Sequence, residues 1–434
     1  MSRYSQSAVT AGVLASAAAI ALGAGALLAV MPGFAYQIGL VLGVAALVGA
    51  ALWTASGRVL NPAWIVITWL YLIGPVGTFL IDHGVGLQMT ALATLAPITF
   101  VAAVLLTKTD VRDRLILLGP LAFLLFLAAL SLAWSEDPDY GATKLTLSVW
   151  TGFLPAACVL VLAAASQRVS WALIVALGLM SAVALIAYAA PSADYPGRPT
   201  LFGENPIWAA RALFVGALVA IFGPFPSLVR FVSAALMIAA GLMTLSLGPA
   251  LGLAIGVWAG VGESFRRGNR LEPRFLVVWT ALGVLMGIAV LIALSGSPEG
   301  DTSLISSLAR QQDVTSRQAY LGASLPLFAQ SPLVGIGIGG FAATGLDTYP
   351  HNLFVEVGLE LGLLGLIAFG GWLWLAIRGA AGSPVLVALV VGTTVFTLFS
   401  GSLGSNTEFW IFTALAVARY PMARRQPAAL EASP

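Results

Sequence analysis

The chain has 434 residues, of which 59% are hydrophobic and only 9% are charged, and its formal net charge is +2. Soluble domains carry about 25% charged residues, so this composition excludes a soluble protein built around one large core. It indicates instead a protein whose helices lie in a membrane, and it gives no reason to expect nucleic acid as a partner.

Apolar stretches of membrane length recur along the chain, beginning with one that we interpret as a retained first span rather than a cleaved signal peptide. A helix needs about 20 residues to cross the hydrocarbon core, and continuously apolar runs exclude a barrel of alternating strands. We therefore predict an all-α, polytopic membrane helical bundle with about 12–14 transmembrane helices, forming a single transmembrane domain over residues 1–434. The candidate spans are 8–31, 36–55, 62–81, 87–107, 115–133, 144–165, 171–190, 205–223, 228–246, 248–262, 275–294, 352–377, 384–400 and 406–420.

Lysine and arginine residues predict the orientation of these spans. With a cytoplasmic N-terminus, alternating loops place 15 of the 20 basic residues inside, and the other 5, which include Lys144, outside. Cytoplasmic loops are the richer in Lys and Arg, which favours this polarity. Residues 295–350 then form one large external loop, whose apolar spacing predicts short amphipathic helices near the membrane surface. Residues 421–434 form a short cytoplasmic tail.

The functional interpretation depends mainly on the polar residues between residues 302 and 365. Arg317 and Arg310 fall in the external loop, where guanidinium groups either bind phosphate or anchor to lipid headgroups. His351 opens a span and can exchange a proton near neutral pH. Arg211 lies inside a span, where a charge is costly without a partner, so we expect it to be buried and functional unless it snorkels to the surface.

Two glutamates follow His351 on one helix face, because Glu356 and Glu360 are four residues apart. They are expected either to polarise the site or to pair structurally with an arginine. Together with Arg310 and with the neighbours of His351, Tyr349 and Asn352, they are predicted to bind substrate.

The pattern Gly335-x-Gly337-x-x-Gly340 matches a dinucleotide-binding fingerprint, but it lacks the preceding strand and the βαβ unit that such a site needs. We interpret these glycines as allowing a close-packed turn against neighbouring helices. No His, Cys and carboxylate cluster has the spacing of metal ligands. The sequence therefore predicts neither a metal nor a cofactor.

Taken in order, these residues resemble the O-antigen ligase and O-antigen polymerase superfamily. Arg317 is followed by Ser331-Pro332-Leu333-Val334-Gly335-Ile336-Gly337 and Phe341, and then by Pro350-His351-Asn352. His351-Asn352, nine residues and Gly362-Leu363-Leu364-Gly365 are similar to the ligase signature of His-Asn, nine positions and Gly-x-x-Gly. The likeness is specific over residues 300–366 and general elsewhere.

The resemblance implies an inverting, metal-independent glycosyltransferase. Such an enzyme takes a glycan from a polyprenyl diphosphate carrier, such as undecaprenyl diphosphate, at the periplasmic side of the bacterial inner membrane. It passes the glycan to a hydroxyl group of a lipid or glycan acceptor. The resemblance assigns the diphosphate to Arg317 and assistance of the transfer to His351. Leu247 stands where many members have a second arginine, and we predict that Arg211 supplies the missing charge.

Three hypotheses remain open. A ligase moves a finished glycan onto an acceptor such as the lipid A–core of lipopolysaccharide. A polymerase extends the glycan on its carrier, and it shares the same motifs. A transporter or lipid flippase does no covalent chemistry and is expected to show inverted repeats and broken helices at the midplane. The sequence shows no clear repeat, and its charged groups cluster at the predicted outer face.

A membrane-impermeant thiol reagent tests the predicted orientation. The native Cys158 is first replaced by Ser, because it is the one cysteine of the chain. Ser303→Cys is then expected to be labelled in intact spheroplasts, and Asn269→Cys only after the membrane is opened. The opposite labelling pattern would place residues 295–350 in the cytoplasm and contradict the assignment.

Overall fold

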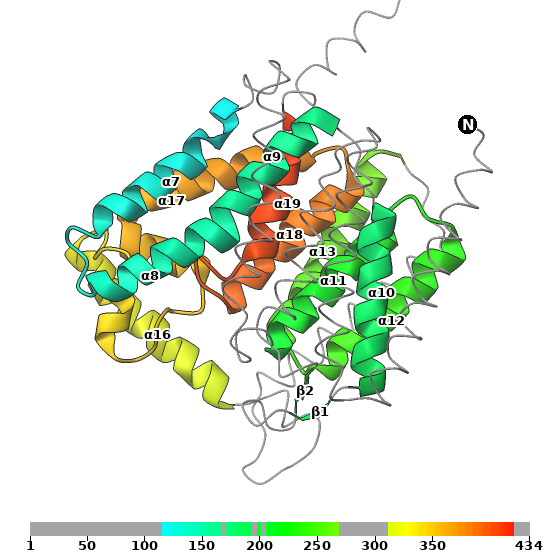
Figure 1. The fold of residues 1–434 in the computed structure, drawn as a ribbon, viewed down its shortest axis with the longest axis horizontal. Helices are drawn as coiled ribbons and strands as arrows, with labels where there is room; N and C mark the ends of the chain where they lie inside the picture. Colours follow the sequence, from blue (N-terminus) through cyan, green and yellow to red (C-terminus); the bar gives the residue numbers. More distant parts are fainter. Residues whose placement is uncertain are drawn as a thin grey trace, which may run out of the picture. The chain divides into compact units, whose positions relative to one another are not determined.

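The computed structural model describes residues 115–166, 171–188, 190–191, 198–200, 205–268 and 311–420 (Figure 1). The regular secondary structure of these residues is helical, apart from two short strands, Ala190–Pro191 (β1) and Pro199–Thr200 (β2), which pair antiparallel. The chain divides into two compact units, residues 1–100 with 165–244, and residues 101–164 with 245–434. Arg310 and the predicted spans 8–31, 36–55, 62–81, 87–107 and 275–294 lie outside the described residues.

The described part of the first unit is a packed group of three apolar helices: Trp171–Tyr188 (α10), Pro206–Phe222 (α11) and Ser227–Met243 (α12). α11 begins where its sequence predicts, because Asn205 accepts a hydrogen bond from Ile207 N–H at 2.9 Å and a proline follows the cap. All three helices agree with predicted spans.

The second unit is centred on one long helix, α17, which packs against α7, α16, α18 and α19, while α13 packs along α18 (Figure 1). The helices of this unit are Leu115–Leu118 (η3), Gly119–Ser131 (α7), Pro138–Ser148 (α8), Val149–Phe153 (η4, a π-helix), Leu154–Ser166 (α9), Leu247–Arg266 (α13), Gln311–Gln330 (α16), Gly340–Thr344 (η5), Leu353–Ala380 (α17), Pro384–Phe399 (α18) and Thr407–Val417 (α19).

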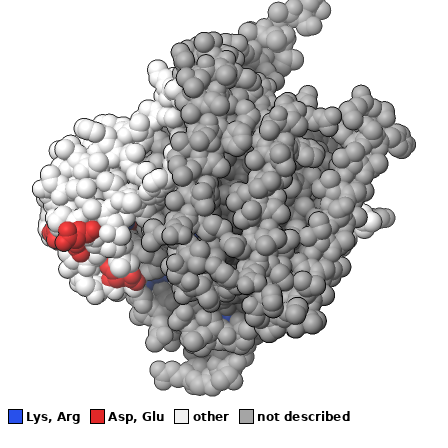
Figure 2. Space-filling view, viewed as in Figure 1, with Lys and Arg blue, Asp and Glu red and all other residues white. Residues whose placement is uncertain are grey.

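Within the described residues, three helical stretches are long and apolar enough to cross a membrane: Leu115–Trp134, Pro138–Val161 and Leu353–Ala380. Their outer surfaces expose large apolar side chains, among them Phe126 at 59% and Ile367 at 61%. The described surface in Figure 2 is mostly uncharged, with acidic side chains gathered in small groups. Such surfaces suit hydrocarbon and support a helical membrane protein, and the full count of spans stays a prediction.

The placement of Lys144 in an external loop is wrong. α8 begins at Pro138 rather than at Lys144, because Asp137 caps it by accepting a hydrogen bond from Tyr140 N–H at 3.0 Å. A π-turn then joins α8 to α9 without interrupting the helix. Lys144 therefore lies buried inside a helix, and it is 2% exposed.

The external loop was predicted to contain short amphipathic helices, and its described part contains α16 and η5. Three residues on the inner side of α16, Tyr320, Leu327 and Phe328, pack on a buried cluster of Ile336, Phe341 and Leu359. Its outer side exposes apolar residues such as Leu325, at 63%. Residues 331–341, which follow α16, are here called the glycine loop.

The glycine loop is built into a break in α17. Gly362 has φ 64° and ψ −161°, which interrupts the helix. A regular helix bonds the next two N–H groups, of Leu363 and Leu364, to carbonyls four residues earlier. Here those N–H groups donate instead to the carbonyls of Pro332 and Leu333, at 2.8 and 3.2 Å.

The two carbonyls released by the break are satisfied by the same loop. Ile336 N–H donates to the Leu359 carbonyl and Gly337 N–H to the Glu360 carbonyl, both at 3.0 Å. Four backbone hydrogen bonds therefore replace the two that the helix gives up, and both N–H groups and both carbonyls released at the break have a partner.

This docking requires glycine at two positions. A Cβ at Gly335 would lie 2.3 Å from the carbonyl carbon of Glu360, and a Cβ at Gly362 would lie 2.4 Å from that of Leu333. Both glycines also have positive φ, which side chains disfavour. The prediction that the glycines allow a close-packed turn is confirmed.

Candidate functional site

His351 lies between the glycine loop and α17, with its ring partly exposed. Its φ of 54° is unusual for a residue with a side chain and costs about 1–3 kcal/mol. Asn352 caps α17 directly after it, because its side-chain oxygen accepts hydrogen bonds from Phe354 N–H at 3.0 Å and Val355 N–H at 3.2 Å. The left-handed backbone of His351 and the capped start of α17 together fix the direction in which the imidazole projects from the backbone.

Three side chains hold the imidazole of His351. Its Nε2 lies 3.1 Å from Oδ2 of Asp347. The ring of Tyr320, from α16, stacks on it at 5.7 Å and 20°, and the ring of Tyr349 lies 4.5 Å away at 49°. Tyr320 also donates its hydroxyl hydrogen to the same Asp347 oxygen at 2.9 Å.

The Asp347 carboxylate accepts hydrogen bonds from several neighbouring groups. Burial alone acts to raise its pKa, and hydrogen bonds from Thr348 N–H, Tyr320 and His351 outweigh that effect, so the pKa of Asp347 lies below its usual value. A lowered carboxyl pKa means that the charged form stabilises the fold at neutral pH, and that this contribution is lost as the pH falls through the folded-state value.

Arg317 lies on α16 three residues before Tyr320, so both side chains project from the same face of that helix. Its guanidinium carbon lies 6.0 Å above the centre of the Phe399 ring, at the end of α18. Because Tyr320 stacks on His351, α16 brings Arg317 and His351 to one end of the second unit.

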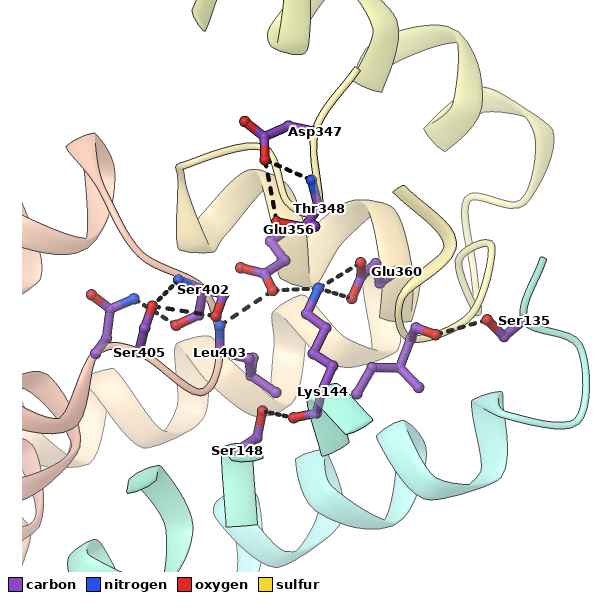
Figure 3. Close-up of polar contacts among 12 residues, drawn as sticks. Ser135, Lys144, Ser148, Asp347, Thr348, Glu356, Glu360, Ser402, Leu403 and Ser405 are labelled. Atoms are coloured by element: carbon purple, nitrogen blue, oxygen red, sulfur yellow. Dashed lines mark hydrogen bonds and ion pairs between the residues drawn. The ribbon is translucent and has the colours of Figure 1, made fainter. Parts of the chain in front are cut away.

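Glu356 and Glu360 are paired with a lysine rather than with an arginine. Lys144 Nζ lies 2.6 Å from Glu356 Oε1 and 2.7 Å from each carboxylate oxygen of Glu360 (Figure 3). All three side chains are buried. The three ammonium hydrogens therefore have three acceptors, which a buried charge requires.

The lysine–glutamate cluster joins three separate segments. Lys144 comes from α8, the glutamates come from α17, and Glu356 Oε1 also accepts a hydrogen bond from Leu403 N–H at 3.2 Å, in the turn between α18 and α19 (Figure 3). The other oxygen, Glu356 Oε2, accepts no hydrogen bond from the described residues. The cluster carries one positive and two negative formal charges.

The remaining predicted site residues have separate environments. Arg211 is 1% exposed within α11 of the first unit, as expected for a buried arginine. Tyr349 contacts the imidazole, and Asn352 is engaged as a helix cap. Arg310 lies outside the described residues. Assignment of these residues to substrate binding stays a prediction.

Three residues around the site were not found from the sequence: Lys144, Asp347 and Tyr320. For Lys144 the sequence does contain a signal: Asp137-Pro138 is typical of a helix start, and it places the lysine more than one turn inside the span. Asp347 precedes His351 by four residues in a loop, and no periodic pattern relates the two.

Residues 232–370 match a protein-family model described as O-antigen ligase, and no curated protein matches the chain. The match contains Arg317, His351, Asn352 and the glycine loop, while Lys144 and Arg211 lie before it. It supports the O-antigen ligase superfamily and, with it, a role in glycan processing at a membrane.

Replacing Lys144 by Met is expected to destabilise the protein by about 3–5 kcal/mol, because it leaves two carboxylates buried without a cation. Glu360→Gln is expected to cost more than Glu356→Gln. Glu360 holds the ammonium group with both oxygens, whereas glutamine at 356 keeps one acceptor for Lys144 and removes the excess negative charge. Thermal unfolding in detergent measures the differences.

Thr143→Val is the matched control, because Thr143 is the exposed neighbour of Lys144 and its hydroxyl bonds only the Asp139 carbonyl. It is expected to unfold at the wild-type temperature. A Lys144→Met protein as stable as the wild type would show that the cluster contributes no stability.

Proposed function

We propose that this member of the O-antigen ligase superfamily transfers a glycan from a polyprenyl diphosphate carrier to a hydroxyl group of an acceptor, at the periplasmic face of the bacterial inner membrane. The observation that supports it most is the partly exposed imidazole of His351, held at the end of the unit where α16 brings Arg317. Both residues lie within the part of the chain that matches the family model.

The proposed reaction is a single displacement. The acceptor hydroxyl oxygen attacks the anomeric carbon and forms the new glycosidic bond, while the bond from that carbon to the diphosphate oxygen breaks. The bonding electron pair leaves with the polyprenyl diphosphate, and the hydroxyl proton passes to the neutral imidazole of His351. Attack from the face opposite the leaving group inverts the anomeric configuration.

Negative charge develops on the diphosphate as it leaves, so a cation near it lowers the barrier. Arg317 supplies this charge in our proposal, because guanidinium is planar, stays protonated and can donate two parallel hydrogen bonds to phosphate. The predicted phosphate-binding role of Arg211 stays a separate proposal, motivated by its burial within an apolar helix of the first unit, where an arginine is costly and commonly functional. Because a guanidinium group can stabilise this charge, the proposed transfer needs no metal ion.

Gene deletion with complementation tests the proposal. Cells without the gene are expected to lose the attached glycan and to accumulate lipid-linked polymer, and the wild-type gene restores attachment. The His351→Ala and Arg317→Ala genes are expected not to restore attachment, although both proteins insert normally. Loss of the general base alone lowers the rate about 10²–10⁴-fold, and loss of Arg317 removes the cation that stabilises the leaving group. Arg317→Lys is expected to restore attachment partly, since a point charge lacks the bidentate fork.

Arg378→Ala is the matched arginine control, because Arg378 is exposed and lies 5.6 Å over the ring of Trp374 on α17. It is expected to complement fully. A deletion strain that keeps single glycan units attached and loses only chain length would identify a polymerase, and a strain with unaltered glycan would contradict both activities.

A further inference from the structure

We propose that Asp347 is a positioning residue for His351, and that it makes Nδ1 of the imidazole the nitrogen that accepts the proton. The inference rests on the proposed function, since it concerns how the histidine acts as a base. It adds a residue that the sequence motif does not contain, and it names the reacting atom.

The hydrogen-bond pattern of Asp347 leads to this assignment. A carboxylate accepts hydrogen bonds and donates none, so the atom 3.1 Å from Asp347 Oδ2, His351 Nε2, must carry a hydrogen. A neutral imidazole carries one ring hydrogen. The unprotonated ring nitrogen of His351 is therefore Nδ1, because Nε2 is the nitrogen bonded to Asp347.

The carboxylate itself is fixed in place. Oδ2 also accepts the hydroxyl hydrogen of Tyr320 at 2.9 Å, and Oδ1 accepts from Thr348 N–H at 2.6 Å. Tyr320 in turn packs edge-on against Phe341 of the glycine loop, with ring centres 6.0 Å apart. A chain of contacts thus runs from Phe341, in the buried apolar cluster, through Tyr320 and Asp347 to His351.

This arrangement serves the proposed step in two ways. Before transfer, it holds the ring in one tautomer and one orientation, so Nδ1 is ready to take the acceptor proton. During transfer, the ring gains that proton and becomes positive, and the Asp347 carboxylate beside it stabilises the charge. The proton and the charge stay on His351 until they are returned to solvent, so Asp347 itself is not consumed or protonated.

Nitrogen NMR of ¹⁵N-histidine-labelled protein tests the contact without any assay of transfer. The chain contains two histidines, so His83→Gln leaves His351 as the one imidazole. At neutral pH we expect one protonated ring nitrogen, Nε2, and one unprotonated ring nitrogen, Nδ1. Asp347→Asn and Asp347→Leu are each expected to shift both signals, because the fixed tautomer is released. A hydrogen on Nδ1, a doubly protonated ring at neutral pH or unchanged signals in both variants would overturn the proposal.

Transfer kinetics test the consequence. Asp347→Asn is expected to lower kcat by about 10–100-fold with little change in KM, because in this proposal Asp347 acts through His351 and does not itself contact the substrate. Added to His351→Ala, it is expected to cost no further activity, since it acts through the histidine. Asp347→Glu, which restores a carboxylate, is expected to regain part of kcat. Asp139→Asn, which removes an exposed carboxylate at the start of α8, is the control and is expected to keep wild-type kcat.

The outcomes separate the two proposals. If His351→Ala transfers glycan at the wild-type rate, the base role in the proposed function fails, whereas the NMR signals still test the Asp347 contact. If His351→Ala is inactive while Asp347→Asn keeps full kcat, the proposed function stands and the positioning role of Asp347 is refuted.

Discussion

The four hydrogen bonds between the glycine loop and the break in α17 are the constraint on which the site depends. They give a partner to each of the four backbone groups released by the break at Gly362, and they fix the loop that packs against Tyr320. Losing one partner would leave a buried group unsatisfied, at about 1–3 kcal/mol each. Because Tyr320 stacks on His351 and bonds Asp347, the position of the imidazole follows from this docking.

The cluster of Lys144, Glu356 and Glu360 shares Glu360 with this backbone junction. It connects α8, α17 and the α18–α19 turn. Buried ion pairs add little net stability compared with apolar packing, but they are costly to break. They also tolerate few alternative arrangements, because an ammonium group with three carboxylate oxygens has little freedom. We regard the cluster as fixing the position of α17, and therefore of His351, which directly precedes the cap of that helix.

The sequence predicted much of this because hydropathy and short motifs depend on local chemistry. Apolar length located most of the described helices, although α8 begins earlier than predicted and α16 lies in the predicted loop, and steric reasoning identified the role of Gly335. The sequence misplaces Lys144, because a charged residue ordinarily marks the edge of a span and the glutamates that neutralise this one lie more than two hundred residues later. It missed Asp347 because a contact between two loop residues follows from tertiary packing, for which a single sequence carries no periodic signal.

Transfer by purified protein from a lipid-linked glycan donor to an acceptor, in the presence of excess chelator, tests the central claim most directly. The account predicts a product whose anomeric configuration is inverted relative to the donor, formed at an undiminished rate with chelator and lost in His351→Ala. Transfer that stops with chelator and returns with Mg²⁺ or Mn²⁺, or a product with retained configuration, would contradict it.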